Sequence, residues 1–248
     1  MAADKIAILV VNYNMPERTD ALCGHIGRRV KWPHDLIVID NGSDLVAPSQ
    51  FTTLWLPENR QTTGGLLAGL RSADLGGPYL AYWFLITSAE LIGENDPLAS
   101  MAQLLLDDPD AVGVHLALTV DSTTAWAHLK ARGGDQPRRT WMIDNIASLY
   151  RAEWFDEVGR FDPAMTYAWG IDLETCWKAR QQGRSLWIHE AAQVRKVTDI
   201  GYSMERMNMS AEERRQKAGA QMTEVLSAKY GPEWNWRMRN EFVEDAWR

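Results

Sequence analysis

The chain has 248 residues and a formal net charge of −7, and 46% of its residues are hydrophobic; this composition excludes a disordered chain and is sufficient for one large domain or two small ones. Its two cysteines exclude a disulfide framework and a cysteine-based zinc site, and the acidic balance argues against non-specific nucleic-acid binding as the main task. The sequence has no apolar run of about 18 residues and no signal-peptide pattern, so we expect a cytoplasmic protein without a transmembrane helix.

Short apolar runs alternate with amphipathic segments over about the first 120 residues. The runs predict strands over 5–11, 36–40, 51–56, 79–86 and 111–118, and helices over 16–30, 64–70 and 97–106. This alternation is typical of an α/β fold with a mostly parallel sheet flanked by helices. Ligands of such folds bind beyond the carboxyl ends of the strands. We therefore expect three polar strand ends to meet at one edge: Asn12-Tyr13-Asn14, Asp40-Asn41 and Thr87-Ser88-Ala89-Glu90.

The second half of the chain predicts a loop, more strands and three helices. Residues 121–140 are polar, with a basic end at Arg138-Arg139, and predict a mobile loop. Strand character follows over 141–150 and again over 185–197, with helices over 151–158, 171–182 and 211–230. Ser210 and Glu213 have the spacing of a capping box before the last helix. This amphipathic helix is expected to pack on the domain, to contact a second copy of the chain, or to contact a membrane surface.

The first two polar strand ends carry chemistry that suits a nucleoside. A carboxylate such as Asp40 can accept hydrogen bonds from a base N–H or a ribose hydroxyl, and the following Asn41-Gly42 allows close approach of backbone. The same Asp-Asn-Gly-Ser sequence is also a common turn. No G-x-G-x-x-G follows the first strand, which disfavours a dinucleotide-binding site.

A pair of carboxylates, Asp172 and Glu174, begins the predicted helix over 171–182. Residues two apart do not share a helix face, so one carboxylate can face a site while the other caps the helix or pairs with a cation. Negative charge is also favoured at a helix N-terminus by the helix dipole. A plain capping arrangement is therefore the alternative to a catalytic role.

Several ordered motifs together resemble family 2 glycosyltransferases of the GT-A fold, especially the rhamnosyltransferase-like members. They are Val-Asn-Tyr-Asn at 11–14, Val-Ile-Asp-Asn-Gly-Ser at 38–43, a partial glycine-rich segment with Asn59, Gly64-Gly65 and Gly69, Asp-Glu-Val-Gly-Arg-Phe-Asp at 156–162, and Asp172-Leu173-Glu174 followed by Arg180 and Gly183. The resemblance spans about residues 5–197. It implies a GT-A domain over 1–200, with a donor half over about 1–120 and an acceptor half over about 121–200, and a helical C-terminal extension over 201–248.

The resemblance implies an inverting transfer of a hexose or deoxyhexose from a nucleotide sugar to an acceptor hydroxyl, as in polysaccharide biosynthesis, with UDP or dTDP as the expected nucleotide. Asp172 takes the position of the general base. The donor would be bound by Asn12, Tyr13, Asn14, Asp40, Asn41, Gly65, Thr87 and Ser88. The acceptor would be bound by Trp169, Gly170 and Trp126. The chain holds 12 tryptophans, and aromatic rings of this kind can stack against a sugar. A lipid-linked acceptor would place the protein at the inner face of the membrane.

The sequence departs from the family where Mg²⁺ or Mn²⁺ is usually held. The Asp-x-Asp motif is replaced by Thr87-Ser88-Ala89-Glu90, so Glu90 is either a metal ligand in a shifted register or the site has no metal. Lys196 or Arg195, near the end of the last predicted strand, is expected to neutralise the diphosphate instead.

Two further classes remain open. A degenerate member that binds a nucleotide sugar without catalysis is favoured by the lost Asp-x-Asp and disfavoured by the retained Asp172. A nucleotidyltransferase of similar fold is disfavoured because residues 10–17 lack its basic glycine-rich signature. The acceptor stays open between saccharide, lipid-linked saccharide, protein and modified nucleic acid.

Overall fold

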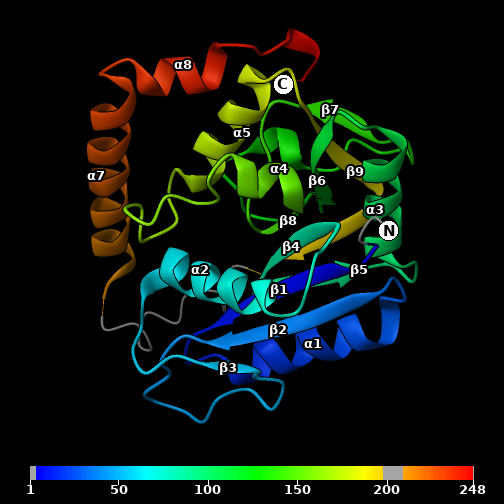
Figure 1. The fold of residues 1–248 in the computed structure, drawn as a ribbon, viewed down its shortest axis with the longest axis vertical. Coiled ribbons are helices and arrows are strands. Elements are labelled where there is room, and N and C mark those ends of the chain that lie inside the picture. Colours follow the sequence, from blue (N-terminus) through cyan, green and yellow to red (C-terminus); the bar gives the residue numbers. More distant parts are fainter. Residues whose placement is uncertain (1–3, 198–208, 248) are drawn as a thin grey trace.

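The computed structural model describes residues 4–197 and 209–247, and a nine-stranded sheet lies at its centre (Figure 1). The strand order is β3-β2-β1-β4-β8-β6-β9-β5, and β7 pairs with β9 off this path. The strands are β1 (Ile6–Asn12), β2 (His34–Asp40), β3 (Leu54–Trp55), β4 (Ala81–Ile86), β5 (Ala89–Ile92), β6 (Ala111–Leu118), β7 (Arg138–Thr140), β8 (Ala147–Arg151) and β9 (Ser185–Lys196).

The first four strands of the chain pair in parallel, as the alternation of strands and helices predicts. The second half is mixed: β6 and β9 are parallel, but β8 runs antiparallel to both β4 and β6. Because β5 and β7 also run antiparallel to β9, the sheet as a whole is mixed rather than mostly parallel.

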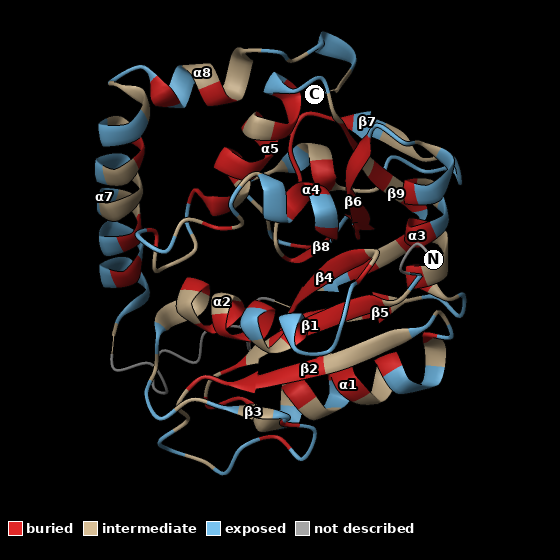
Figure 2. Cartoon of the chain, in the orientation of Figure 1, coloured by how far each residue is buried: buried red, intermediate tan, exposed pale blue. Residues whose placement is uncertain are grey.

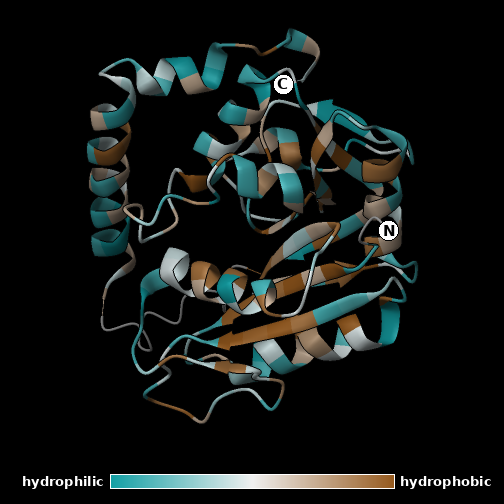
Figure 3. Ribbon diagram, viewed as in Figure 1, coloured by the Kyte–Doolittle hydropathy of each residue, from teal (hydrophilic) through white to brown (hydrophobic). Residues whose placement is uncertain are grey.

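Helices cover both faces of the sheet, which gives three layers (Figure 1). Alternate residues of β1 enter opposite cores: Ile6, Ile8 and Val10 pack towards α1 (Pro16–Arg29) and α3 (Pro97–Asp107), whereas Ala7 and Leu9 pack towards α2 (Gln61–Asp74). A strand buried on both faces explains its unbroken apolar sequence, and Figure 2 shows the central strands almost entirely buried, with the same strands among the most hydrophobic segments in Figure 3. The helices are α1 (Pro16–Arg29), α2 (Gln61–Asp74), α3 (Pro97–Asp107), α4 (Ala152–Glu157), α5 (Ile171–Gln181), α7 (Ala211–Tyr230) and α8 (Trp234–Asn240).

The C-terminal extension folds back on the domain through α7 and α8, and α8 crosses beside α5 (Figure 1). The Ser210 hydroxyl accepts a hydrogen bond from the Glu213 backbone N–H at 3.1 Å, so the predicted cap is confirmed. Leu226, Trp234 and Met238 are buried in the same core as α5. The apolar side of α7 therefore packs on the domain, which was one of the three expectations for this helix. None of the helices in 4–197 and 209–247 is long and apolar enough to cross a bilayer.

The segment 121–140 differs from the mobile loop that its polar sequence predicts. It contains a short 3₁₀ turn at Ala127–Leu129, and its basic end forms β7 against β9. The Arg138 guanidinium binds the buried Glu190 carboxylate at 2.5 Å and donates to the His128 carbonyl at 2.6 Å. Because Glu190 is 52 residues from Arg138 in the sequence, local polarity alone could not reveal that the segment is fixed.

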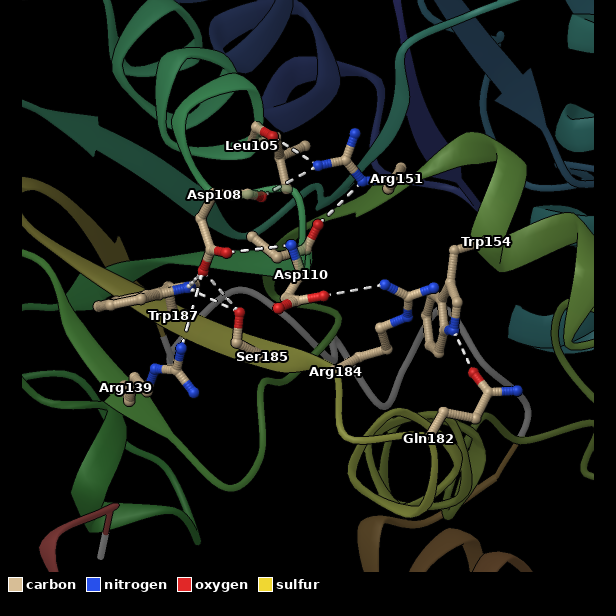
Figure 4. A network of polar contacts seen from close by, with 11 residues as sticks. Leu105, Asp108, Asp110, Arg139, Arg151, Trp154, Gln182, Arg184, Ser185 and Trp187 are labelled. Carbon is tan, nitrogen blue, oxygen red and sulfur yellow. Dashed lines mark hydrogen bonds and ion pairs between the residues drawn. The ribbon is translucent and has the colours of Figure 1, made fainter.

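A polar network holds the start of β9 against β6 and α3 (Figure 4). The Asp108 carboxylate accepts hydrogen bonds from Ser185 Oγ at 2.8 Å and Trp187 Nε1 at 3.0 Å. Burial alone would raise the pKa of Asp108, but these hydrogen bonds hold the pKa below its usual range. Arg151 Nε donates to the Ala111 carbonyl at 2.9 Å, and Arg184 pairs with Asp110 at 3.1 Å. The network lies at the opposite end of β9 from Lys196, and its groups satisfy one another, which is typical of a structural role.

Gly69 of α2 allows this helix to lie close to the sheet. A Cβ there would lie 2.7 Å from Ile39 Cδ1 and 2.8 Å from Leu9 Cδ2. We expect Gly69→Ala to lower the free energy of unfolding by about 1–3 kcal/mol through overpacking. Gly27→Ala in α1 is the matched control, because a Cβ there meets nothing within 4 Å; it should raise stability by about 0.5–1 kcal/mol. Chemical denaturation measures both, and equal effects would contradict this account of the contact.

Candidate functional site

A cavity of about 460 Å³ lies beyond the carboxyl ends of β1 and β4. It brings together side chains from residues 11–88, from residues 124–196 and from the C-terminal helices α7 and α8. Of the residues that the sequence predicts for the site, those lining the cavity are Tyr13, Asn41, Thr87, Ser88, Trp126, Trp169, Gly170, Asp172 and Lys196. The predicted site residues that do not line it are Asn12, Asn14, Asp40, Gly65, Glu90 and Arg195.

Asp40 is buried, and its carboxylate is used to join the ends of β1 and β2. It accepts hydrogen bonds from Asn12 Nδ2 at 2.9 Å, from Ser43 Oγ at 2.7 Å and from Ser43 N at 3.0 Å. Asn14 has φ 56°, and its side-chain oxygen accepts a hydrogen bond from the Asp44 backbone N–H. Its neighbour Tyr13 lines the cavity, whereas Asn14 does not. Asp40 thus has the turn-forming contacts that were the alternative to contact with a nucleoside, and the polar groups of Asn12 and Asn14 are bonded to the same turn. Contact of these three residues with a donor stays a prediction.

The partial glycine-rich segment forms the start of α2, and this part of the chain supplies one wall of the cavity. Asn41 organises it: Asn41 Nδ2 donates to Asn59 Oδ1 at 3.1 Å, and Asn41 Oδ1 accepts from Arg60 N at 3.0 Å. Gly65 has a packing role, because a Cβ there would lie 2.8 Å from Val11 Cγ1. Asn59, Gln61 and Thr62 belong to this segment and line the cavity, but the sequence did not predict them as site residues.

The residues at the end of β4 do not fit a divalent cation. Glu90 is ion-paired with Arg18 at 3.5 Å and with Arg195 at 3.6 Å, and it does not line the cavity. In the structure Glu90 thus faces two arginines rather than the cavity, and its role as a metal ligand stays a prediction. Mg²⁺ and Mn²⁺ prefer several carboxylate and carbonyl oxygens. Across the described residues, no group of three or more histidines, cysteines or carboxylates is placed to hold a metal ion.

Lys196 and Arg195 point to different sides of β9, as adjacent strand residues do. Lys196 lines the cavity and is the strand partner of Ala89, which stands where the family resemblance expects the last aspartate of an Asp-x-Asp motif. Arg195 is paired with Glu90 and, at 3.1 Å, with Asp121. Of the two cations proposed for the diphosphate, only Lys196 is brought to the cavity.

Asp172 reaches the cavity from the first turn of α5. The helix begins after Gly170, which has φ 90° and lies so close to α7 that a Cβ would be 2.8 Å from Met222 Cγ. Glu174 is turned away and buried, where it binds Lys229 Nζ and accepts from the Tyr230 hydroxyl at 2.5 Å. In the structure, one carboxylate of the pair thus lines the cavity and the other pairs with a cation, and the role of Asp172 as general base stays a prediction.

Asp144, which the sequence analysis missed, lies in the same cavity as Asp172. Burial raises the pKa of Asp172 well above its usual value, and the negative charge of Asp144 raises it further. Burial also raises the pKa of Asp144, while the charge of Lys196 opposes that shift. The signal available in the sequence was a carboxylate interrupting the apolar run Trp141-Met142-Ile143, since buried carboxylates cluster at functional sites.

The neighbouring Asn145 also lines the cavity. Its Oδ1 accepts from Ser148 Oγ at 2.8 Å, while its buried Nδ2 has no hydrogen-bond partner among the described residues. A buried amide donor without a partner calls for an acceptor from outside the chain. Asn145 is thus a candidate contact for a substrate oxygen.

The two tryptophans expected at the acceptor side differ in their accessibility. Trp169 is 41% exposed beside the cavity. Trp126 is half-buried, with the Arg239 guanidinium carbon 4.7 Å from its ring centre and the Trp141 ring edge-on at 5.5 Å. Trp169 therefore offers the more open surface for a sugar ring, and Trp126 is already in contact with a cation from the extension.

No protein-family model and no curated protein matches this sequence. Among solved structures, the fold is similar to that of GalNAc-T7 with UDP, GalNAc and Mn²⁺, with a TM-score of 0.61 and 12% identity over 99% of this chain and 55% of that one. It is also similar to the mannosyltransferase PcManGT from Pyrobaculum calidifontis in complex with GDP-Man and Mn²⁺, with a TM-score of 0.61 and 15% identity over 98% of this chain and 71% of that one. The chain thus spans little more than half of the GalNAc-T7 chain. These likenesses show that the chain has the fold of the GT-A glycosyltransferases.

Proposed function

We propose that this chain is an inverting glycosyltransferase that moves a hexose or deoxyhexose from a UDP- or dTDP-sugar to an acceptor hydroxyl. The observation that carries the proposal is the position of Asp172 in the first turn of α5, where it lines the same cavity as the polar ends of β1 and β4 in a GT-A fold. The sequence motifs that resemble family 2 enzymes support the inverting mechanism. Two similar structures hold UDP and GDP-Man, which supports a nucleotide sugar as the donor class.

In this mechanism, Asp172 accepts the proton of the acceptor hydroxyl while the oxygen attacks the anomeric carbon. The bond between that carbon and the diphosphate oxygen breaks, and the nucleoside diphosphate leaves with the bonding electron pair. Lys196 supplies positive charge where negative charge develops on the leaving group. Asn145 Nδ2 donates to a substrate oxygen, and Trp169 stacks against the acceptor.

Metal-independent transfer is the part of the proposal most easily tested. Lys196 lies beside Ala89, so a cation borders the position where the metal-binding carboxylate is lost. We expect nucleotide sugars to raise the melting temperature equally in EDTA and in Mn²⁺, in a thermal-shift panel of UDP-, dTDP- and GDP-sugars. A ligand at about 100 times its Kd stabilises by about 2.7 kcal/mol. Stabilisation that appears only with Mn²⁺ would refute metal independence.

A second candidate is a nucleotide-sugar-binding protein without catalysis. It is favoured by the diversion of Glu90 into ion pairs with Arg18 and Arg195, away from the cavity. The two functions are separated by incubating the protein with the nucleotide sugar that stabilises it most and measuring release of nucleoside diphosphate. Release that depends on Asp172 supports the transferase, and binding without any release supports the second candidate.

A further inference from the structure

Helix α7 of the C-terminal extension borders the cavity and is fixed there by contacts with the loop before α5. Gln221 Oε1 accepts a hydrogen bond from Thr166 Oγ1 at 3.1 Å and one from the Tyr167 backbone N–H at 3.4 Å. The Trp169 ring lies alongside the same helix, because a Cβ on Gly219 would be 3.9 Å from Trp169 Cζ3. The position of α7 beside the cavity is therefore set by the domain, and side chains of this helix belong to the cavity wall.

Arg214 brings a positive charge from α7 to the cavity. It lies in the first turn of the helix, lines the cavity and is only 8% exposed. Arg214 Nη2 donates to Thr62 Oγ1 at 3.4 Å, near the start of α2. The residue before Thr62 is joined to the end of β2, since Asn41 Nδ2 donates to the Gln61 carbonyl at 3.0 Å. Arg214 thus lies on the wall that carries Asn41, one of the residues expected to bind the donor.

The formal charges in the cavity show why a nucleotide sugar needs a second cation there. Among the described residues that line it, Lys196, Arg214 and Arg239 are cations, and Asp144 and Asp172 are carboxylates. The diphosphate of a nucleotide sugar adds negative charge, and charges interact strongly where water is largely excluded. A divalent cation would counter this charge more fully than one ammonium group can. Lys196 by itself therefore replaces only part of the charge that a metal ion would supply.

Arg214 suits this task better than Arg239. The Arg239 guanidinium carbon lies 4.7 Å from the centre of the Trp126 ring, a residue that we expect at the acceptor. Arg239 Nε also donates to Asn235 Oδ1 at 2.8 Å, one turn earlier on α8. Arg214 instead lies beside Thr62, in the segment that starts α2, and a planar guanidinium matches the oxygens of a phosphate group.

We propose that Arg214 is a donor-binding residue: its positive charge and that of Lys196 together compensate the diphosphate of the nucleotide sugar in place of a divalent cation. The inference rests on the proposed function, because it takes a nucleotide sugar as the ligand. It gives the C-terminal extension a part in donor binding, which the motifs over residues 5–197 do not contain. Because the charge of the guanidinium carries this role, its removal weakens binding of a nucleoside diphosphate more than binding of the nucleoside.

The test is isothermal titration calorimetry in EDTA, with a nucleoside and its diphosphate as paired probes. The pairs are UDP with uridine, dTDP with thymidine and GDP with guanosine, and the variants are measured with the pair whose diphosphate binds most tightly. In Arg214→Gln we expect the Kd of the diphosphate to rise by about 10-fold to 100-fold, and the Kd of the nucleoside to stay the same. Arg214→Lys should recover part of the affinity, because it keeps the charge but not the planar donor group.

Arg215→Gln is the matched control, since it removes a cation from the next residue of the same helix. Arg215 pairs with Glu212 at 2.6 Å on the exposed surface and does not line the cavity. We expect this variant to leave both Kd values unchanged. If Arg214→Gln bound the diphosphate as tightly as the unmodified chain, the proposal would be overturned. An equal loss of affinity for nucleoside and diphosphate would also overturn it, because that result indicates a role in shaping the wall rather than in binding phosphate.

The outcomes distinguish a failure of this inference from a failure of the proposed function. Diphosphate binding in EDTA that Arg214→Gln leaves unchanged removes the inference and keeps the transferase. Binding that requires Mn²⁺ does the same, whereas no binding of any of the three diphosphates, with or without Mn²⁺, removes both. If Arg214→Gln fails to fold, Arg214→Met keeps an apolar stem of similar length without the charge. The same selective loss of diphosphate affinity is expected there, and its absence would overturn the inference equally.

Discussion

Asp172→Asn is expected to reduce kcat by about 10²–10⁴-fold while nucleotide-sugar binding persists. Asparagine has nearly the same shape, but its amide cannot accept the proton of the attacking hydroxyl. The hydrogen bond from Leu173 N to Asp172 Oδ1, at 2.8 Å, can be kept by the amide oxygen. Nucleoside diphosphate release measures the loss, and thermal shift with the same nucleotide sugar measures retained binding.

The stability of Asp172→Asn shows whether a loss of activity comes from the missing base or from unfolding of the variant. The pKa of Asp172 is raised in the folded chain, chiefly by burial, so the folded state binds more protons than the unfolded state over the interval between the two pKa values. Stability therefore falls as pH rises through that interval. Asp172→Asn removes this penalty, and we expect its free energy of unfolding at pH 8 to exceed that of the unmodified chain. A variant that is both inactive and less stable at pH 8 would contradict this role.

The fold was predictable where one segment carries its own signal. The apolar run of β1 indicated a strand buried on both faces, and the capping residues Ser210 and Glu213 marked the start of α7. In contrast, β5 was missed because residues 89–92 become a strand only by pairing with β9. The expected strand over 51–56 shrinks to Leu54–Trp55, at the edge of the sheet, where β2 is its only partner among the described strands.

The lining of the cavity was predictable in part for a similar reason. Asp172 lies in a recognisable motif, and Lys196 was found by position at the end of a strand. Arg239 and Arg214 were not found, because an arginine on an exposed helix and one that reaches a cavity look the same in sequence. Glu90 and Arg195 do not line the cavity, because the register of β5 on β9 makes them strand partners that face each other. Which of these side chains reach the cavity thus depends on partners that are distant in sequence, and local motifs do not contain that information.

Lys196→Met is expected to lower kcat by about 10²–10³-fold, in EDTA and in Mn²⁺ alike. The ammonium group lines the cavity beside Ala89, where a metal would otherwise counter the charge of the diphosphate. A methionine fills similar space without charge, so the leaving group loses its stabilisation as the bond breaks. Lys196→Arg should keep most of the activity, because it retains the charge.

Arg195→Met is the matched control for this experiment, since it removes a cation from the adjacent residue of the same strand. Arg195 is bound by Glu90 and Asp121 and does not line the cavity. Exposed ion pairs of this kind contribute about 0–1 kcal/mol, so we expect a small loss of stability and a nearly unchanged kcat. If Lys196→Met behaved like Arg195→Met, or if Mn²⁺ restored its activity, positive charge at position 196 would not replace a metal, and the leaving group would have to be stabilised elsewhere in the cavity.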